Sequence, residues 1–159
     1  MIDPIEFRRV MGHFASGVTV VTTVMGNGEP CGLTASAVCS VSVNPVLVLV
    51  CVEHGADSHG CIVAAGRFAV NILADEGGES LSRRFATYEV EDKFRGVAFR
   101  EEATGAPVLE GALAWLDCRV AQAVEAGDHT IFLGEVVAGD AREGTPLVYY
   151  RGGYGRFTP

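Results

Sequence analysis

A histidine directly follows a glycine–aspartate pair in the stretch Gly127-Asp128-His129. The flanking residues are typical of two strands joined by a hairpin, so His129 would leave a tight turn and project over a cleft. Asp128 could then fix the tautomer of the imidazole ring, which could orient a ligand or transfer a proton. The alternative is an ordinary Gly-Asp turn beside a surface histidine, and the tripeptide alone favours that alternative.

Small hydroxyl residues alternate with apolar residues from Gly32 to Asn44, which predicts one extended strand. One side of it would carry the apolar residues Leu33, Ala35, Ala37, Cys39, Val41 and Val43 and would face a core. The other side, with Thr34 and Ser36, has little bulk, so a flat polar ligand could lie against it and accept hydrogen bonds from hydroxyl and backbone N–H groups. The alternative is a hydroxyl-rich face in water.

Several basic and aromatic residues could bind the anionic and ring parts of such a ligand. The candidates are Arg83, Arg84, Lys93 and Arg151 for a phosphate, Ser58 at a predicted helix start, and Tyr149, Tyr150 and Tyr154 for stacking on a ring. Each cation could equally be a solvated charge, and the tyrosines could simply pack on a hairpin.

Other catalytic signatures are missing from the sequence. It has no Gly-x-Gly-x-x-Gly after a strand, no Gly-x-Ser-x-Gly, no His-Glu-x-x-His and no P-loop. The four histidines are too scattered to indicate a metal site. If the chain is an enzyme, a bound cofactor therefore supplies the reactive chemistry.

The elements that would position these residues are mostly strands. A helix is expected from the Asp3 cap to Gly17, with an apolar stripe at Phe7, Val10, Met11 and Phe14 and with Glu6 completing a capping box. Short helices are expected at 58–65, capped by Asp57 or Ser58, and at 80–86. The expected strands are 18–24, the stretch 32–44, 46–52 (buried on both faces), 68–73, 113–125, 129–138 and 147–150.

About seven strands with short connections predict a mainly β fold. The loops are too short for repeated βαβ crossovers, so the sequence favours an antiparallel barrel with a few short helices at its openings. At 159 residues, the chain is expected to form one domain over 1–159.

Composition restricts the partners. The net charge of −8 and the lack of a basic cluster argue against nucleic acid, and no apolar run is long enough to cross a membrane. A hydrophobic content of 48% is high for a small monomer, which favours a homo-oligomer. The five cysteines have no C-x-x-C spacing, which favours buried reduced thiols in a cytoplasmic protein without zinc or disulfides.

An ordered set of motifs resembles the short-chain flavin reductases, the NAD(P)H:flavin oxidoreductase components of two-component monooxygenases. These motifs are 14–23, 32–37, 45–48, 66–71, 81–86, 92–94, 127–129 and 146–154, and they span nearly the whole chain. The resemblance implies an FMN-binding split barrel, usually a homodimer, with flavin in a groove near the subunit interface.

The resemblance also implies roles for individual residues. The flavin ring or ribityl chain would meet Thr34, Ala35, Ser36 and Ala37, and the backbone of Val50, Cys51 and Val52 would approach the ring. Ser58 would meet the phosphate, with Arg83, Arg84 or Lys93 as charge partner. Asp128 and His129 match the nicotinamide-side motif, and Tyr149, Arg151 and Tyr154 belong to the closing segment.

Two positions depart from the family pattern. Ala56 stands where related sequences commonly have a hydroxyl, and Gly78 stands where they often have glutamine. Both changes remove a polar contact near the expected phosphate region, which leaves the choice between FMN and FAD open.

The activity implied is hydride transfer from nicotinamide C4 of NADH or NADPH to N5 of FMN or FAD, with His129 as the catalytic residue. Reduced flavin would pass to a separate flavin-dependent monooxygenase. One alternative is a non-catalytic flavin- or haem-binding split-barrel protein. Another is an oxidase of the pyridoxamine-phosphate type, disfavoured because basic residues for a second phosphate are few.

Overall fold

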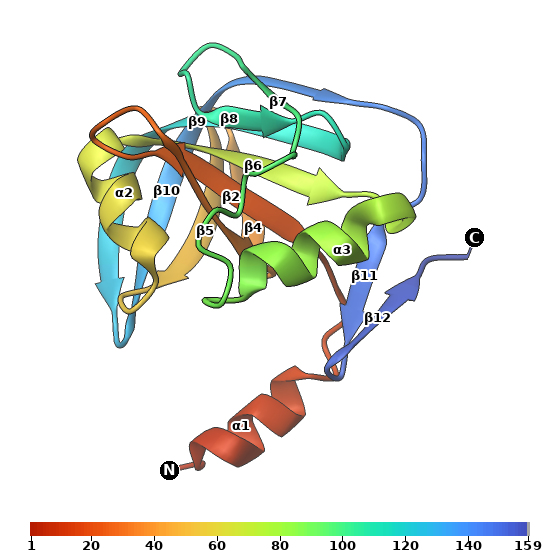
Figure 1. Ribbon diagram of the computed structural model, residues 1–159. Helices are drawn as coiled ribbons and strands as arrows, with labels where there is room; N and C mark the ends of the chain where they lie inside the picture. The colour runs from red at the N-terminus through yellow and green to blue at the C-terminus, as the bar shows by residue number, and fades with distance from the viewer. Residues whose placement is uncertain (159) are drawn as a thin grey trace.

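The structure is a computed structural model that describes residues 1–158. Over this range the chain forms three helices and twelve strands (Figure 1). The helices are α1 (Pro4–Met11), α2 (Asp57–Ala65) and α3 (Asp75–Ala86). The strands are β1 (Ser16–Gly17), β2 (Thr19–Val24), β3 (Pro30–Ala35), β4 (Val38–Val43), β5 (Val46–Glu53), β6 (Arg67–Leu73), β7 (Phe99–Glu101), β8 (Pro107–Leu109), β9 (Ala112–Ala126), β10 (His129–Ala141), β11 (Leu147–Tyr150) and β12 (Gly153–Arg156).

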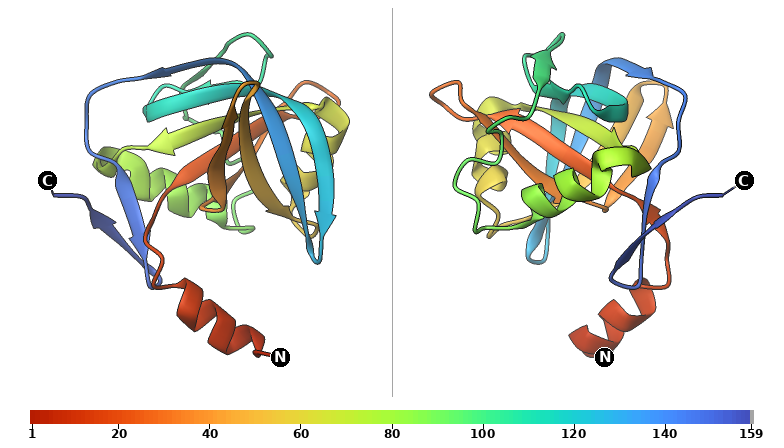
Figure 2. Two further views of the ribbon diagram at one scale, coloured as in Figure 1. Left: turned by 180° about the vertical axis from the view of Figure 1, so that it is seen from behind. Right: turned by 45° about the vertical axis from the view of Figure 1, so that its right-hand side comes forward.

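Seven strands form the main sheet, in the order β3-β2-β6-β9-β10-β5-β4, and every neighbouring pair is antiparallel. The two edge strands, β3 and β4, are consecutive in the chain and are joined by only Ser36 and Ala37. The edges must therefore meet at one corner, so the sheet is rolled, as the view from behind shows (Figure 2). The antiparallel split barrel expected from the sequence is confirmed.

The stretch Gly32–Asn44 is two strands, so the single strand expected there is wrong. β3 pairs with β2, whereas β4 pairs with β5. At the break, the Cys51 N–H donates to the Ala37 carbonyl oxygen at 3.0 Å. Because the second half changes partner, the apolar residues of β4 do not continue the inner face, and Cys39, Val41 and Val43 are exposed.

The core lies inside the rolled sheet, where Phe68, Phe132 and Val50 are fully buried. β5 fully buries only alternate residues, so the expectation that both of its faces are buried is wrong: Leu47, Leu49 and Cys51 are only partly buried, because their face of the strand borders solvent and a cavity. A second cluster around Phe85 and Leu109 packs beneath α3. This helix is longer than the turn expected at 80–86, with non-helical residues at Glu76 and Gly77.

The hairpin β9–β10 is confirmed and extends further than expected. At its irregularity, a Cβ on Gly134 would lie 2.5 Å from Phe68 Cζ, so only glycine lets the strand approach the core ring there. Asp117 on β9 is buried, and its carboxylate accepts a hydrogen bond from the Thr104 backbone N–H at 2.7 Å. The strands β7, β8 and β12 were not expected from the sequence.

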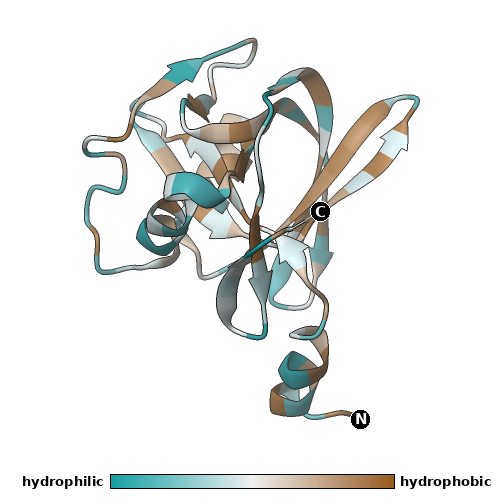
Figure 3. Ribbon diagram, turned by 90° about the vertical axis from the view of Figure 1, so that its right-hand side faces the viewer, coloured by the Kyte–Doolittle hydropathy of each residue, from teal (hydrophilic) through white to brown (hydrophobic). Residues whose placement is uncertain are grey.

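The helix α1 projects away from the sheet (Figures 1 and 3). Its Asp3 cap is confirmed, since the carboxylate accepts hydrogen bonds from the N–H groups of Ile5 and Glu6 at 2.9 and 3.0 Å. The Glu6 side chain pairs with Arg9 and does not complete a capping box. The helix ends at Met11 and not at Gly17, because Ser16 and Gly17 form β1 against β11. The expected apolar stripe is exposed at Phe7, Val10, Met11 and Phe14.

Candidate functional site

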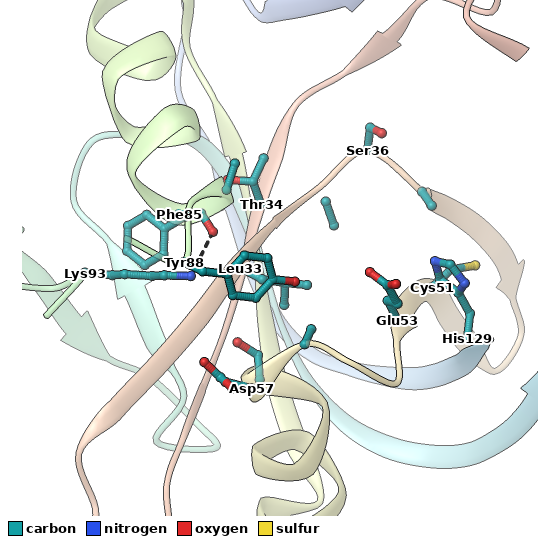
Figure 4. Close-up of a pocket in the computed structure, with 15 residues that line it drawn as sticks. Leu33, Thr34, Ser36, Cys51, Glu53, Asp57, Phe85, Tyr88, Lys93 and His129 are labelled. Atoms are coloured by element: carbon teal, nitrogen blue, oxygen red, sulfur yellow. Dashed lines mark hydrogen bonds between the residues drawn. The ribbon is translucent and has the colours of Figure 1, made fainter. Parts of the chain in front are cut away.

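A cavity of about 260 Å³ opens at the corner where the chain leaves β3 for β4 (Figure 4). One wall is the run from Leu33 to Ala37, so Thr34, Ala35, Ser36 and Ala37 all line the cavity, as the sequence suggested. Thr34 Oγ1 donates to the Ser82 carbonyl oxygen at 2.6 Å and keeps its lone pairs for a ligand, while Ser36 is exposed. The wall therefore offers small side chains and polar atoms to a flat molecule.

β5 contributes only alternate side chains to this cavity. Cys51 lines it, and burial raises the pKa of the thiol, so Cys51 is a neutral wall and not a nucleophile. Val50 and Val52 point to the other face and are fully buried in the core, which places their side chains away from the cavity. Glu53 is the cross-strand neighbour of His129 and lines the same end of the cavity, and sequence reasoning missed it.

His129 lines the cavity from the start of β10, with Asp128 in the turn beside it. Their side chains are 2.7 Å apart, from His129 Nδ1 to Asp128 Oδ1. This hydrogen bond lowers the pKa of Asp128, so the carboxylate is charged at neutral pH and can only accept. Nδ1 therefore carries a proton, and Nε2 is the ring nitrogen available to a ligand.

Behind the hairpin, the Thr130 hydroxyl joins three other side chains. It lies 2.8 Å from His59 Nε2, 3.1 Å from His54 Nε2 and 3.1 Å from Glu125 Oε1. Thr130 is 1% exposed, and His59 belongs to the first turn of α2. The network thus ties α2 to the strand that carries His129. Sequence reasoning missed it because these residues are far apart in the chain.

The start of α2 forms another wall, where Ser58 lines the cavity. The expected cap by Asp57 or Ser58 is wrong: the cap residue is Ala56, and no side chain satisfies the first N–H groups of the helix. Ser58 is 3% exposed, and its hydroxyl accepts a hydrogen bond from Cys31 Sγ at 3.4 Å.

Lys93, Arg84 and Arg83 lie in three different places. Lys93, the only lysine in the chain, lines the cavity and donates one of its protons to the Phe85 carbonyl oxygen at 3.2 Å. Arg84 lines a second, neighbouring cavity and donates to the Arg95 carbonyl oxygen at 2.7 Å. Arg83 lies outside both cavities, paired with Glu79 at 2.8 Å.

The C-terminal hairpin β11–β12 is not brought to either cavity of this chain. The Tyr154 hydroxyl and the Ser82 hydroxyl form a hydrogen bond at 2.8 Å. The Arg83 guanidinium carbon lies 4.9 Å from the centre of the Tyr154 ring. Tyr149 packs on Tyr154, and the Arg151 N–H donates to the Gly12 carbonyl oxygen. Their expected roles beside a cofactor stay predictions.

Other groups of the described chain bear on the chemistry. Within residues 1–158, no three His, Cys, Asp or Glu side chains are grouped to bind a metal. All five cysteines are free thiols, but only Cys118 is buried, so the expectation of buried thiols is wrong for Cys39, which is exposed.

No helix within 1–158 has the length and apolar character to cross a membrane. The cavity also takes in Tyr88, which the sequence reasoning did not select.

A rolled antiparallel sheet with a groove at the corner of its edge strands is the split-barrel architecture. The chain belongs to the flavin reductase-like domain family, whose model matches residues 11–158.

Individual relatives agree with this assignment. A flavin reductase (NADH) of Kitasatospora aureofaciens is 47% identical over 99% of this chain and 83% of its own length. The reductase component of a 4-nitrophenol 4-monooxygenase/4-nitrocatechol 2-monooxygenase from Rhodococcus opacus has the same identity and coverage. The structure of the Streptomyces globisporus NADH:FAD oxidoreductase, in complex with NAD and FAD fragments, superposes with a TM-score of 0.89 at 40% identity, covering 100% of this chain and 97% of that one.

Proposed function

We propose that this protein is an NAD(P)H-dependent flavin reductase. The observation that carries the proposal is the composition of the corner cavity. Lys93 and the start of α2 lie toward one end, His129 lies at the other, and the hydroxyl-bearing run with Thr34 and Ser36 extends along the cavity between them (Figure 4). The names of the relatives, a flavin reductase (NADH) and a monooxygenase reductase component, support the same activity.

The residues of the cavity fit a flavin. Thr34 to Ala37 leave room for a flat ring and offer polar atoms along its edge, and Cys51 supplies an uncharged wall. Lys93 has two ammonium protons left for a phosphate, and the uncapped N–H groups of α2 favour an anion beside Ser58. Bound FMN or FAD supplies the hydride acceptor, at N5, for nicotinamide C4.

The contribution of the protein is to hold two aromatic rings face to face, with the reacting atoms about 3–3.5 Å apart. His129 Nε2, at the rim, orients the nicotinamide or donates a proton, while Asp128 keeps the proton of Nδ1 in place.

The partners follow from this activity. Reduced flavin is delivered to a separate flavin-dependent monooxygenase, as the name of the Rhodococcus opacus relative supports. A second copy of the chain covers the apolar face of α1, since none of its residues is buried. The five free thiols support a cytoplasmic location, where thiols stay reduced.

The activity is tested by mixing the purified protein with NADH or NADPH and FMN and by following absorbance near 340 nm. We expect consumption of the nicotinamide. Failure with both nicotinamides contradicts the proposal, and a protein that binds flavin without this activity would be a carrier.

Lys93→Met tests the phosphate end of the cavity. We expect the KM for FMN to rise about 10-fold and the KM for riboflavin to stay unchanged, because only FMN has a phosphate for Lys93 to bind. Arg83→Met is the matched control, since Arg83 is a cation outside both cavities. Equal effects on FMN and riboflavin would place the phosphate elsewhere.

A further inference from the structure

Two thiols lie together where β3 packs against α2. Cys31 on β3 and Cys61 on α2 both line the second cavity, of about 1160 Å³, and neither lines the cavity of His129. Cys31 Sγ donates a hydrogen bond to Ser58 Oγ at 3.4 Å, and Cys61 Sγ donates one to the Asp57 carbonyl oxygen, also at 3.4 Å. Because residues three apart in a helix share a face, the contact with Ser58 brings the Cys31 sulfur beside that of Cys61.

The two thiols are not equivalent. Burial, together with a hydrogen bond with Cys31, raises the pKa of the Cys61 thiol to about 12. Cys61 therefore keeps its proton at neutral pH, and a protonated thiol is a poor nucleophile. In a reaction with an oxidant, the first attack falls to Cys31, and the neighbouring Cys61 sulfur can follow.

The other three cysteines have different surroundings and do not line the second cavity. Cys118 is fully buried in the core, and Cys51 belongs to the wall of the first cavity. Cys39 is exposed, with its sulfur 3.1 Å from the Ser40 carbonyl oxygen. Cys31 and Cys61 thus form a pair that the reduction of flavin does not use, open to small molecules that enter the second cavity.

We propose that Cys31 and Cys61 form a dithiol site that hydrogen peroxide oxidises to an intramolecular disulfide between β3 and α2. The Cys31 sulfur attacks one peroxide oxygen, the O–O bond breaks, and a first water leaves, which makes Cys31 a sulfenic acid. The Cys61 sulfur then attacks the Cys31 sulfur, the S–O bond breaks, and a second water leaves with the Cys61 proton. The two thiols lose two electrons in total, and the peroxide gains them. A reductant reverses the change, as is usual for redox-sensing disulfides of the cytosol.

The reaction is tested on the wild-type protein by counting thiols and by mapping the linked peptides. After treatment with hydrogen peroxide, the number of free thiols in the denatured chain should fall by two, from five to three. A glutamyl endopeptidase cuts after Glu53, which puts Cys31 and Cys61 on separate peptides. Mass spectrometry without reductant should find these two peptides joined, and added dithiothreitol should separate them and restore five thiols.

Substitutions test the order of attack. In Cys61→Ser, the sulfenic acid should stay on Cys31 and be trapped by dimedone, whereas Cys31→Ser should give neither the disulfide nor an adduct on Cys61. The matched control is Cys39→Ser, which removes an exposed thiol outside both cavities and should still lose two thiols.

Three results overturn the proposal: an unchanged thiol count in the wild type, a disulfide that joins other cysteines, or a dimedone adduct on Cys61 in Cys31→Ser. The first two are measured on the wild type, so they do not depend on the folding of a variant. The thiol count also does not depend on flavin. A protein that oxidises this dithiol but does not oxidise NADH therefore contradicts the proposed function alone.

Discussion

Asp128 determines which nitrogen of His129 can meet a ligand, because a charged carboxylate can only accept the Nδ1 proton. The Gly-Asp-His turn suggested this pair, because neighbouring residues in a tight turn lie close together, although the tripeptide alone favoured an ordinary turn beside a surface histidine. It did not predict Tyr88, because nothing local distinguishes a loop tyrosine at a groove from one in solvent. The approach of the Val50, Cys51 and Val52 backbone to the ring stays a prediction, although strand alternation buries the two valine side chains.

His129→Ala should lower kcat by about 100-fold or more if Nε2 donates a proton in the rate-limiting step. The Kd for flavin should change less than 2-fold, since His129 lies at the far end of the cavity from Lys93. Stopped-flow measurement of flavin reduction checks the rate, and His13→Ala, an exposed histidine on the α1 side, is the control. An unchanged rate would remove His129 from the mechanism.

The pH dependence follows from the lowered pKa of Asp128. A carboxylate whose pKa is lowered in the folded state stabilises the fold fully at pH values above the ordinary aspartate pKa of about 3.9. This stabilisation is lost as the pH falls through the lowered pKa. Above pH 5, the Asp128–His129 hydrogen bond therefore persists. Activity is measured from pH 5 to pH 7 in the wild type and in Asp128→Asn. If both lose activity over this range, the group that titrates is not the Asp128 carboxylate.

At the scale of elements, α2 and β10 are fixed to one another by the Thr130 hydroxyl. This contact places the start of α2, with Ser58, relative to the hairpin that carries His129. The sequence predicted the helix from its expected cap and closing glycine, and the strand from the hairpin turn before it. It could not predict the contact between them, or the exchange of partners at Ser36 and Ala37, because both depend on strands that are distant in the chain.

Thr130→Val should raise the Kd for FMN about 5-fold and lower the melting temperature, because it removes the buried hydroxyl that bonds the half-buried His59 of α2 to β10. Thr130→Ser keeps the hydroxyl and should restore both values. Titration with FMN and a thermal melt measure the two effects. A lower melting temperature with unchanged FMN affinity would mean that Thr130 only stabilises the fold and does not position α2.

In the molecule as a whole, α1 stands apart from the rolled sheet (Figure 1). The Arg151 N–H joins the C-terminal hairpin to Gly12, but no residue of α1 itself is buried. The sequence predicted the apolar stripe on this helix, but a pattern of side chains does not say whether the surface that covers it belongs to the same chain.

Replacing both Phe7 and Phe14 by serine should convert a dimer into a monomer, because the two rings are among the largest exposed apolar groups of the α1 region. Light scattering after gel filtration should give twice the chain mass of 16.8 kDa for the wild type and a single chain mass for the variant. Val63→Ser, another exposed apolar residue, is the control and should stay dimeric. A wild type that elutes as a monomer contradicts the proposed homodimer.

The single lysine of this chain has a practical consequence for handling the protein. Lys93 lies in the groove, so reagents that acylate amines have only that side chain and the α-amino group to modify. Coupling at Lys93 to a sensor surface or a dye would place the linker inside the cavity. Attachment through the exposed thiol of Cys39 avoids this, because Cys39 lines neither cavity.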